Sequence, residues 1–207
     1  MLDFSNSKIL IVGDVMLDKY YFGKVDRISP EAPVPIVNIQ KEESRLGGAS
    51  NVANNIVSLG GHSLLCGVIG HDLFGKEIER ISRHKNIDTF LLKTSSPTIT
   101  KARIIGGKQQ IVRVDYEDKS ELNADNKKLF RDTISRILPE YDILVISDYG
   151  KGLISEDLCR YLIKLAHKYD KKVIIDPKGK NWEKYSGADI VTPNVKELSD
   201  IVGYTVP

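Results

Sequence analysis

Short runs of aliphatic and β-branched residues alternate along the chain with longer amphipathic stretches. Consecutive apolar residues predict buried strands, and apolar residues that recur at helical spacing predict helices. The predicted strands cover residues 8–12, 64–69, 142–146, 172–175 and 189–191, and the predicted helices cover 50–59, 73–83, 123–138, 155–169 and 194–201. This order favours an α/β fold, a doubly wound, mostly parallel sheet with helices on both faces.

Two segments break this order and predict strands outside the parallel sheet. Residues 20–39 contain a cluster of prolines followed by alternating apolar and polar positions. Residues 98–113 alternate across Gly106-Gly107, which is typical of a β-hairpin. We expect a small β-lid over the working edge of the sheet; ordinary surface excursions are the alternative. The lid is expected from about residues 15–46 and 98–115, within one domain that covers residues 1–207.

Composition and charge narrow the class of protein. Apolar residues make up 41% and charged residues 28% of the chain, which is globular composition. A net charge of +2 gives no electrostatic footprint for nucleic acid or an anionic membrane. Cys66 and Cys159 lie far apart among apolar neighbours, so neither a disulfide framework nor a cysteine-based zinc site is expected. The chain has neither a long apolar run nor a targeting segment at its amino terminus, which predicts a cytoplasmic protein without a membrane span.

Polar residues follow four of the predicted strands at the point where each strand ends. Ligands of open parallel sheets bind beyond the carboxyl ends of the strands. One aspartate after a strand is more often a cap or a turn former, but four such ends with lysines beside glycines predict a cleft for phosphate and hydroxyl groups. The four ends are Gly13-Asp14, Ser147–Gly152, Asp176–Lys180 and Thr192–Glu197.

The segment Leu46–Asn51 predicts a close approach of a ligand to the main chain. Gly47 and Gly48 lack Cβ atoms, and the N–H groups of the helix that follows favour hydroxyl or anionic oxygens. The alternative is a tight turn with Ser50 as the helix N-cap. The segment lacks the Lys-Ser/Thr of a P-loop, and the first strand does not end in Gly-x-Gly-x-x-Gly, so a dehydrogenase is disfavoured. Trp182 and Tyr185 are expected to cover the edge of the core.

Several strings of residues together resemble the ribokinase-like (PfkB) carbohydrate kinases over essentially the whole chain. They are Gly13-Asp14, Gly47-Gly48 with Asn51, the glycine–aspartate string Gly67–Gly75, Asp176–Lys178 and Thr192–Asn194 with Glu197. Within this family the chain is most similar to the heptose 7-phosphate kinases, which in many bacteria form the first domain of a bifunctional protein of ADP-heptose synthesis. That similarity rests above all on the specific string Arg27–Pro35, with Gly13–Asp18, Leu46–Ala53, Gln109–Asp115 and Ser147–Gly152.

The resemblance implies an activity and a set of site residues. The γ-phosphate of ATP would pass to the anomeric hydroxyl of D-glycero-β-D-manno-heptose 7-phosphate, giving the 1,7-bisphosphate used for the lipopolysaccharide core. ATP is expected at Asn194, Val195, Lys196 and Glu197, with Glu197 acting on Mg²⁺ through water. A homodimer formed through the lid is also implied. The expected sugar residues are Asp14, Gly47, Gly48 and Asn51, and the candidates for the 7-phosphate or the transferring phosphate are Arg103, Arg113, Lys151 and Lys178.

One part of the family pattern is not found in this sequence. The Gly-Ala-Gly-Asp motif, which supplies an anion hole and the aspartate base, is expected downstream of Pro207. We therefore expect an incomplete kinase domain, with the C-terminal part of the fold missing and no catalytic base, that is inactive alone. Two alternatives stay open: another sugar kinase of the family, with a different acceptor, and a non-catalytic ligand-binding fragment.

Overall fold

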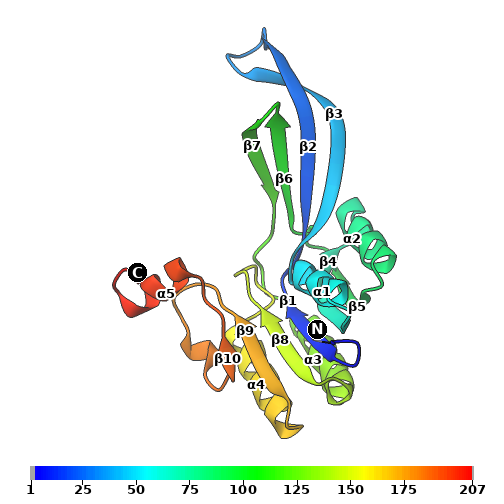
Figure 1. Cartoon of the computed structure of the whole chain (residues 1–207), viewed down its shortest axis with the longest axis vertical. Helices are drawn as coiled ribbons and strands as arrows, with labels where there is room; N and C mark the ends of the chain where they lie inside the picture. Colours follow the sequence, from blue (N-terminus) through cyan, green and yellow to red (C-terminus); the bar gives the residue numbers. More distant parts are fainter. Residues whose placement is uncertain (1–2, 207) are drawn as a thin grey trace.

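The larger of two sheets forms the body of the molecule, which we describe for residues 3–206 from a computed structural model (Figure 1). Its strands run parallel in the order β10-β9-β8-β1-β4-β5. Apolar runs form its centre because both faces are covered, as the sequence pattern predicts. The strands are β1 (Lys8–Gly13), β4 (His62–Gly70), β5 (Asp88–Thr94), β8 (Ile143–Ser147), β9 (Lys172–Asp176) and β10 (Ile190–Val191).

Helices cover both faces of this sheet, so the doubly wound arrangement is confirmed. Ile11 of β1 belongs to a cluster with the helices α1 and α2, whereas Leu10 and Val12 belong to a second cluster with α3 and α4. This division follows from the alternation of side chains along a strand. The helices are α1 (Ala49–Ser58), α2 (Leu73–His84), α3 (Ala124–Ile137), α4 (Glu156–Lys168) and α5 (Val195–Val202).

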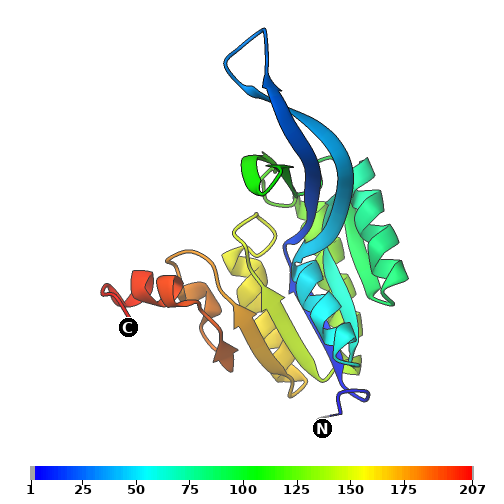
Figure 2. The same cartoon turned by 45° about the horizontal axis from the view of Figure 1, so that its top comes forward.

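The second sheet, which we call the lid, has four strands in the order β3-β2-β6-β7. The pair β2 and β6 is parallel and the other two pairs are antiparallel. Because only Asp14 separates the end of β1 from the start of β2, the lid rises directly from the carboxyl edge of the body. Its long β2–β3 hairpin extends beyond the body in both views (Figures 1 and 2). The lid strands are β2 (Val15–Ile28), β3 (Pro35–Gly48), β6 (Thr100–Gly106) and β7 (Gln109–Tyr116).

Three local features differ from the sequence analysis or were not predicted by it. Ser50 is not the N-cap of α1; Gly48 is, because the Ser50 hydroxyl donates back to the Gly47 carbonyl at 2.6 Å. Strand β5 was not predicted, since its half-exposed residues do not alternate clearly. Pro30 and Pro33 lie in the turn of the β2–β3 hairpin, where the Ser29 N–H donates to the Val34 carbonyl at 2.8 Å, and Pro35 is the first residue of β3.

The state of the cysteines and the length of the helices bear on the class of protein. Cys66 and Cys159 are both free and buried, and burial raises the pKa of the Cys159 thiol to about 12. Within residues 3–206, no helix is both long enough and apolar enough to cross a membrane.

Candidate active site

The four polar strand ends predicted from the sequence lie side by side at one edge of the body. Strands β10, β9, β8 and β1 are consecutive neighbours in the sheet. Gly13 pairs with Ser147, which in turn pairs with Asp176, so three of the strands end in the same register. The loops that follow these strands therefore leave the sheet together and surround one cleft.

Asp14, which follows β1, accepts hydrogen bonds from the loop that follows β8. Its side chain is only 2% exposed, and its Oδ2 accepts the N–H groups of Tyr149 at 2.8 Å and Lys151 at 3.1 Å. Burial raises the pKa of this carboxyl, although the two N–H donors act in the opposite direction. Its Oδ1 is buried without a hydrogen-bond partner among the described residues. Asp14 thus fixes the turn that carries Tyr149.

Two glycines bring the end of β3 against the start of β2. A Cβ atom on Gly47 would lie 2.4 Å from Oδ2 of Asp18, and one on Gly48 would lie 2.4 Å from the Asp14 carbonyl oxygen. Gly48 also has a φ of +55°, a left-handed conformation that favours glycine. The pair therefore leaves room for the Asp18 carboxylate directly beside the start of α1, and the predicted approach of a ligand to this main chain stays a prediction.

A cavity of about 630 Å³, which we call the lid-side cavity, opens between the lid and α1. It brings together the predicted residues Gly47, Gly48, Asn51 and Arg103. Asp14 is not among the residues that line it, so its predicted contact with the sugar stays a prediction. The sequence analysis missed other residues that line the cavity. Asp18 could have been found, because it belongs to the string Gly13–Asp18 and follows Asp14 by four positions. The missed polar and aromatic residues are Asp18, Tyr20, Ser44, Arg45, Asn54, Lys85, Lys101 and Tyr149.

Every cation predicted for phosphate binding pairs with a carboxylate. Arg103 contacts Asp18 at 2.6 Å, and Lys178 contacts Glu197 at 2.8 Å. Arg113 contacts Asp115 at 2.8 Å on the exposed strand β7, and Lys151 contacts Glu117. Arg113 lines neither this cavity nor the two described below.

A second cavity, of about 280 Å³, lies over the ends of β8, β9 and β10, and we call it the sheet-end cavity. Asn194 caps α5 and, together with Glu197, forms a reciprocal capping box. Burial would raise the pKa of Glu197, but the Lys178 ammonium and the Asn194 N–H hold it below its usual value. Lys178, Asn194 and Glu197 line this cavity, whereas Val195, 60% exposed, and Lys196 do not.

Tyr149 lines both the lid-side cavity and the sheet-end cavity. The two cavities therefore meet at this residue, which Asp14 holds through the backbone. A ligand on the lid side and a ligand at the strand ends would face each other here. This arrangement suits the transfer of a group between two bound molecules.

A buried polar network fixes the floor of the sheet-end cavity. Asp148 is almost fully buried and accepts hydrogen bonds from the Lys184 ammonium, from the Tyr185 hydroxyl at 2.7 Å and from the Gly150 N–H at 2.7 Å. The Tyr185 hydroxyl also accepts the Lys178 N–H at 2.9 Å. Tyr185 and Trp182 pack on the core, as predicted, and Tyr185 additionally links β8 to the loop after β9.

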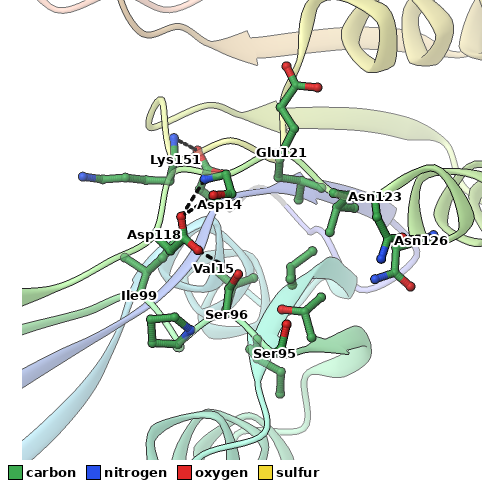
Figure 3. A pocket seen from close by; sticks show the side chains of 17 residues that line it. Asp14, Val15, Ser95, Ser96, Ile99, Asp118, Glu121, Asn123, Asn126 and Lys151 are labelled. Atoms are coloured by element: carbon green, nitrogen blue, oxygen red, sulfur yellow. Dashed lines mark hydrogen bonds between the residues drawn. The ribbon is translucent and has the colours of Figure 1, made fainter.

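A third cavity, of about 240 Å³, lies on the other side of Asp14, and we call it the Asp14 cavity (Figure 3). Its rim carries serine and asparagine side chains, and the Ser96 hydroxyl donates to Asp118 at 3.0 Å (Figure 3). Lys151 lines this cavity and not the lid-side cavity. Residues 3–206 hold no group of three or more His, Cys, Asp or Glu side chains arranged to bind a metal ion.

Comparisons with known proteins agree with this geometry. A family profile described as pfkB family carbohydrate kinase matches residues 6–205. The chain is 48% identical over 193 residues to the bifunctional protein HldE of Helicobacter pylori (strain P12), covering 92% of this chain and 42% of that protein. It is 44% identical over 200 residues to the D-beta-D-heptose 7-phosphate kinase of Bordetella bronchiseptica, covering 96% of this chain and 63% of the relative.

A solved structure supports the fold. The tetrameric inhibited form of phosphofructokinase-2 from Escherichia coli superposes with a TM-score of 0.75 at 21% identity, over 97% of this chain and 65% of that chain. The chain thus spans less than two thirds of the length of each of these three proteins. The predicted ribokinase-like fold is confirmed.

Proposed function

The chain belongs to the pfkB family of carbohydrate kinases, and we propose that it forms the substrate cleft of an ATP-dependent heptose 7-phosphate kinase. The observation that carries the proposal is the meeting of the lid-side and sheet-end cavities at Tyr149. The sugar phosphate occupies the lid side and ATP the strand ends, so that the γ-phosphate and the anomeric hydroxyl face each other. The names of the two relatives, one a heptose 7-phosphate kinase, support the choice of acceptor.

The sugar side is built from one carboxylate, one amide and two glycines. Asp18 and Asn51 offer the oxygen and nitrogen atoms that sugar hydroxyls need, and Gly47 and Gly48 let the sugar approach the main chain. Asp14 acts from beneath, by holding the Tyr149–Lys151 turn in place. Its part in substrate binding, predicted from the sequence, is therefore proposed to be one of positioning.

The nucleotide side is built at the start of α5. Asn194 and Glu197 fix this helix end, and the N–H groups of Val195 and Lys196 belong to its first turn. Such N–H groups stabilise anionic oxygens. Lys178, beside Glu197, supplies positive charge for the transferring phosphate.

Membership in a kinase family implies ATP and a divalent metal ion, and we propose Mg²⁺. Glu197 is the carboxylate available to the ion. Asp176 lies nearby: burial raises the pKa of the Asp176 carboxyl, and the negative charge of Glu197 raises it further. Mg²⁺ is commonly held by one or two carboxylates, water and substrate phosphates, so this sparse donor set fits. When bound, the ion neutralises phosphate charge. Use of ATP also favours the cytoplasm as the place of action.

This chain's residues contribute positioning and charge, which carry most of the catalysis of phosphoryl transfer. No residue of either cavity is assigned as the base, and the base expected beyond Pro207 lies outside the described residues. The lid excludes water from the junction at Tyr149.

We also propose that two copies pair through their lids. Strand β7 is a free edge of the lid and is exposed along its whole length, with Ile111, Val112 and Val114 among its residues. An exposed apolar edge strand favours pairing with another strand. Analytical ultracentrifugation should show a dimer, and Val112→Lys should weaken it.

The test of the proposed function is a comparison of acceptors. The longest natural reading frame that contains this sequence is assayed for phosphoryl transfer from ATP to heptose 7-phosphate, ribose, fructose 6-phosphate and adenosine. We expect a clear preference for heptose 7-phosphate that requires Mg²⁺. Preference for one of the other three would assign the chain to another sugar kinase of the family, and no transfer would favour a ligand-binding role.

A further inference from the structure

Tyr185 carries a hydroxyl group into the core of the body. Its side chain is only 3% exposed and belongs to the apolar cluster that contains α3 and α4. Tyr185 does not line the sheet-end cavity. A hydroxyl buried among apolar side chains needs hydrogen-bond partners, because leaving it without them costs free energy. The partners of this hydroxyl therefore show which parts of the molecule it holds.

The Tyr185 hydroxyl joins the loops that follow two neighbouring strands. It donates to Oδ2 of Asp148, after β8, at 2.7 Å, and it accepts the N–H of Lys178, after β9, at 2.9 Å. Burial raises the pKa of this hydroxyl well above its usual value; the Lys178 N–H opposes the rise, and the hydrogen bond to Asp148 adds to it. The hydroxyl therefore keeps its proton and holds both partners at once.

The main chain of Lys178 depends on this contact for its position. Lys178 lies two residues beyond the end of β9, between Pro177 and Gly179, and Gly179 has a left-handed φ of +81°. Its side chain is 50% exposed, and its ammonium contacts Glu197 at 2.8 Å. The sheet no longer holds the chain here, so the hydrogen bond from Lys178 to Tyr185 sets the direction in which the lysine leaves the loop.

The second oxygen of Asp148 holds the other side of Lys178. Oδ1 accepts the Gly150 N–H at 2.7 Å, and a Cβ atom on Gly150 would lie 3.6 Å from Cγ of Lys178. The aliphatic stem of Lys178 therefore lies beside the Gly150 turn. The Lys184 ammonium contacts Asp148 and balances its buried charge. Lys178 is thus placed between two loops that one buried carboxylate connects.

We propose that Tyr185 is a positioning residue for the nucleotide, which acts through the Lys178 main chain to direct the Lys178 ammonium toward the transferring phosphate. This inference rests on the proposed function and deepens it. Tyr185 touches neither ligand. A loop that is already held from the core needs little ordering when the nucleotide binds, and this favours both affinity and reaction. The acceptor, on the lid side, gains nothing from the contact.

The test is the steady-state kinetics of the longest natural reading frame that contains this sequence. Tyr185→Phe keeps the ring and removes the hydroxyl. It should lower kcat/KM for ATP by about 3- to 10-fold, the range of one hydrogen bond, and change the KM for the acceptor by less than about twofold. The matched control is Tyr161→Phe, which should change neither value, since Tyr161 of α4 packs against the same cluster but lines none of the three cavities.

A second pair of variants tests whether Tyr185 acts through Lys178. Lys178→Gln should lower kcat/KM for ATP more than Tyr185→Phe does, because it removes the charge itself. Adding Tyr185→Phe to Lys178→Gln should cost less than about a further twofold, since residues that act through one another are not additive. A full loss in both backgrounds would show that Tyr185 does not act through Lys178 and overturn the proposal. An equal rise in both KM values with a lower unfolding midpoint would show a merely structural role and overturn it too.

The proposed function and the role of Tyr185 fail in different ways. Transfer to another sugar, with the loss for ATP in Tyr185→Phe, supports Tyr185 and overturns the heptose assignment. Transfer to heptose 7-phosphate with an unchanged kcat/KM for ATP in Tyr185→Phe keeps that assignment and overturns Tyr185. A wild type that transfers phosphate to none of the acceptors overturns both.

Discussion

The body and the lid are stabilised by different interactions. In β1 of the body, the side chains of Leu10, Ile11 and Val12 are completely buried, whereas β7 of the lid is exposed along its whole length. The body is therefore stabilised by apolar burial and dense packing. The lid depends on strand pairing and, where β2 and β3 meet the body, on buried residues such as Leu17 and Leu46.

The ion pairs of the two regions support this difference. Several lid residues form exposed pairs, among them Arg45 with Glu43 and Arg113 with Asp115. Exposed pairs contribute little stability, typically up to about 1 kcal/mol each. Two of the paired cations of the lid, Arg45 and Arg103, line the lid-side cavity. The body thus supplies a rigid edge for chemistry, and the lid supplies charges that can rearrange around a substrate.

The largest expected effect is the loss of unfolding free energy when a core side chain of the body is truncated, compared with the same change in the lid. Phe130 of α3 is 0% exposed and packs against Phe90, with 5.8 Å between ring centroids. Phe130→Ala should lower the free energy of unfolding by about 3–5 kcal/mol. Val112→Ala on β7, where the side chain is 44% exposed, should change it by less than about 0.5 kcal/mol. Urea denaturation measures both, and similar losses would mean that the lid is packed as tightly as the body.

The next largest effect on stability is expected at Asp72, where the body and the lid join. Asp72 caps α2 by accepting the Gly75 N–H at 2.7 Å, and it accepts the Thr98 N–H and hydroxyl, each at 2.7 Å, just before β6. Asp72→Ala should cost about 2–3 kcal/mol, the sum expected for a lost cap and a charged hydrogen bond. A loss below about 0.5 kcal/mol in urea denaturation would contradict a joining role.

The same residue predicts a pH dependence. Burial alone would raise the pKa of Asp72, but the hydrogen bonds from Thr98 and Gly75 outweigh it and hold the pKa below its ordinary 3.8. A lowered pKa stabilises the fold above the unfolded-state value and loses this contribution as pH falls through the folded value. The difference between wild type and Asp72→Ala should therefore be constant near neutral pH and shrink below about pH 4.

A smaller effect concerns binding at the lid. Asp18→Asn should weaken binding of heptose 7-phosphate about tenfold or more, since a carboxylate that accepts from hydroxyls is lost. The unfolding free energy should change by less than about 1 kcal/mol, because the Asp18–Arg103 pair is only partly buried. Asp115→Asn is the control, since Asp115 pairs with Arg113 but does not line the cavity. Equal affinity for wild type and Asp18→Asn would remove Asp18 from the site.

The smallest effect lies at the far edge of the body. Asn194→Ala should destabilise α5 by about 1 kcal/mol through loss of its cap, and both Asn194→Ala and Glu197→Ala should weaken binding of Mg²⁺–ATP. Asp200→Asn, on the same helix but outside the sheet-end cavity, should not. Nucleotide titration monitored by calorimetry distinguishes these outcomes. A similar loss in all three variants would indicate a general effect on the helix.

The body was largely predictable from the sequence because its information is local. The end of each buried strand is visible in the sequence as a change from apolar to polar residues, as at Val12 before Gly13-Asp14. Because the strands are parallel, these ends lie at the same edge of the sheet. The lid side of the site was less predictable, because the positions of its side chains depend on how the lid strands pair with one another. Asp18 reaches the cavity through pairing of β2 with β3, where Met16 meets Gly47 and Leu17 meets Leu46. The carboxylate partners of Arg103 and Arg113 depend on the lid fold in the same way.

The most direct test of a two-substrate cleft is a nuclear magnetic resonance titration of this chain, in which the amide signals report where each ligand binds. Heptose 7-phosphate should shift the signals of Gly47, Gly48 and Asn51, and a non-hydrolysable Mg²⁺–ATP analogue should shift those of Asn194 and its first helical turn. Both ligands should shift Tyr149, where the cavities meet. A sugar phosphate that instead shifts Ser95 and Ser96 in the Asp14 cavity, or a nucleotide that leaves Tyr149 and Asn194 unmoved, would contradict the cleft proposed here.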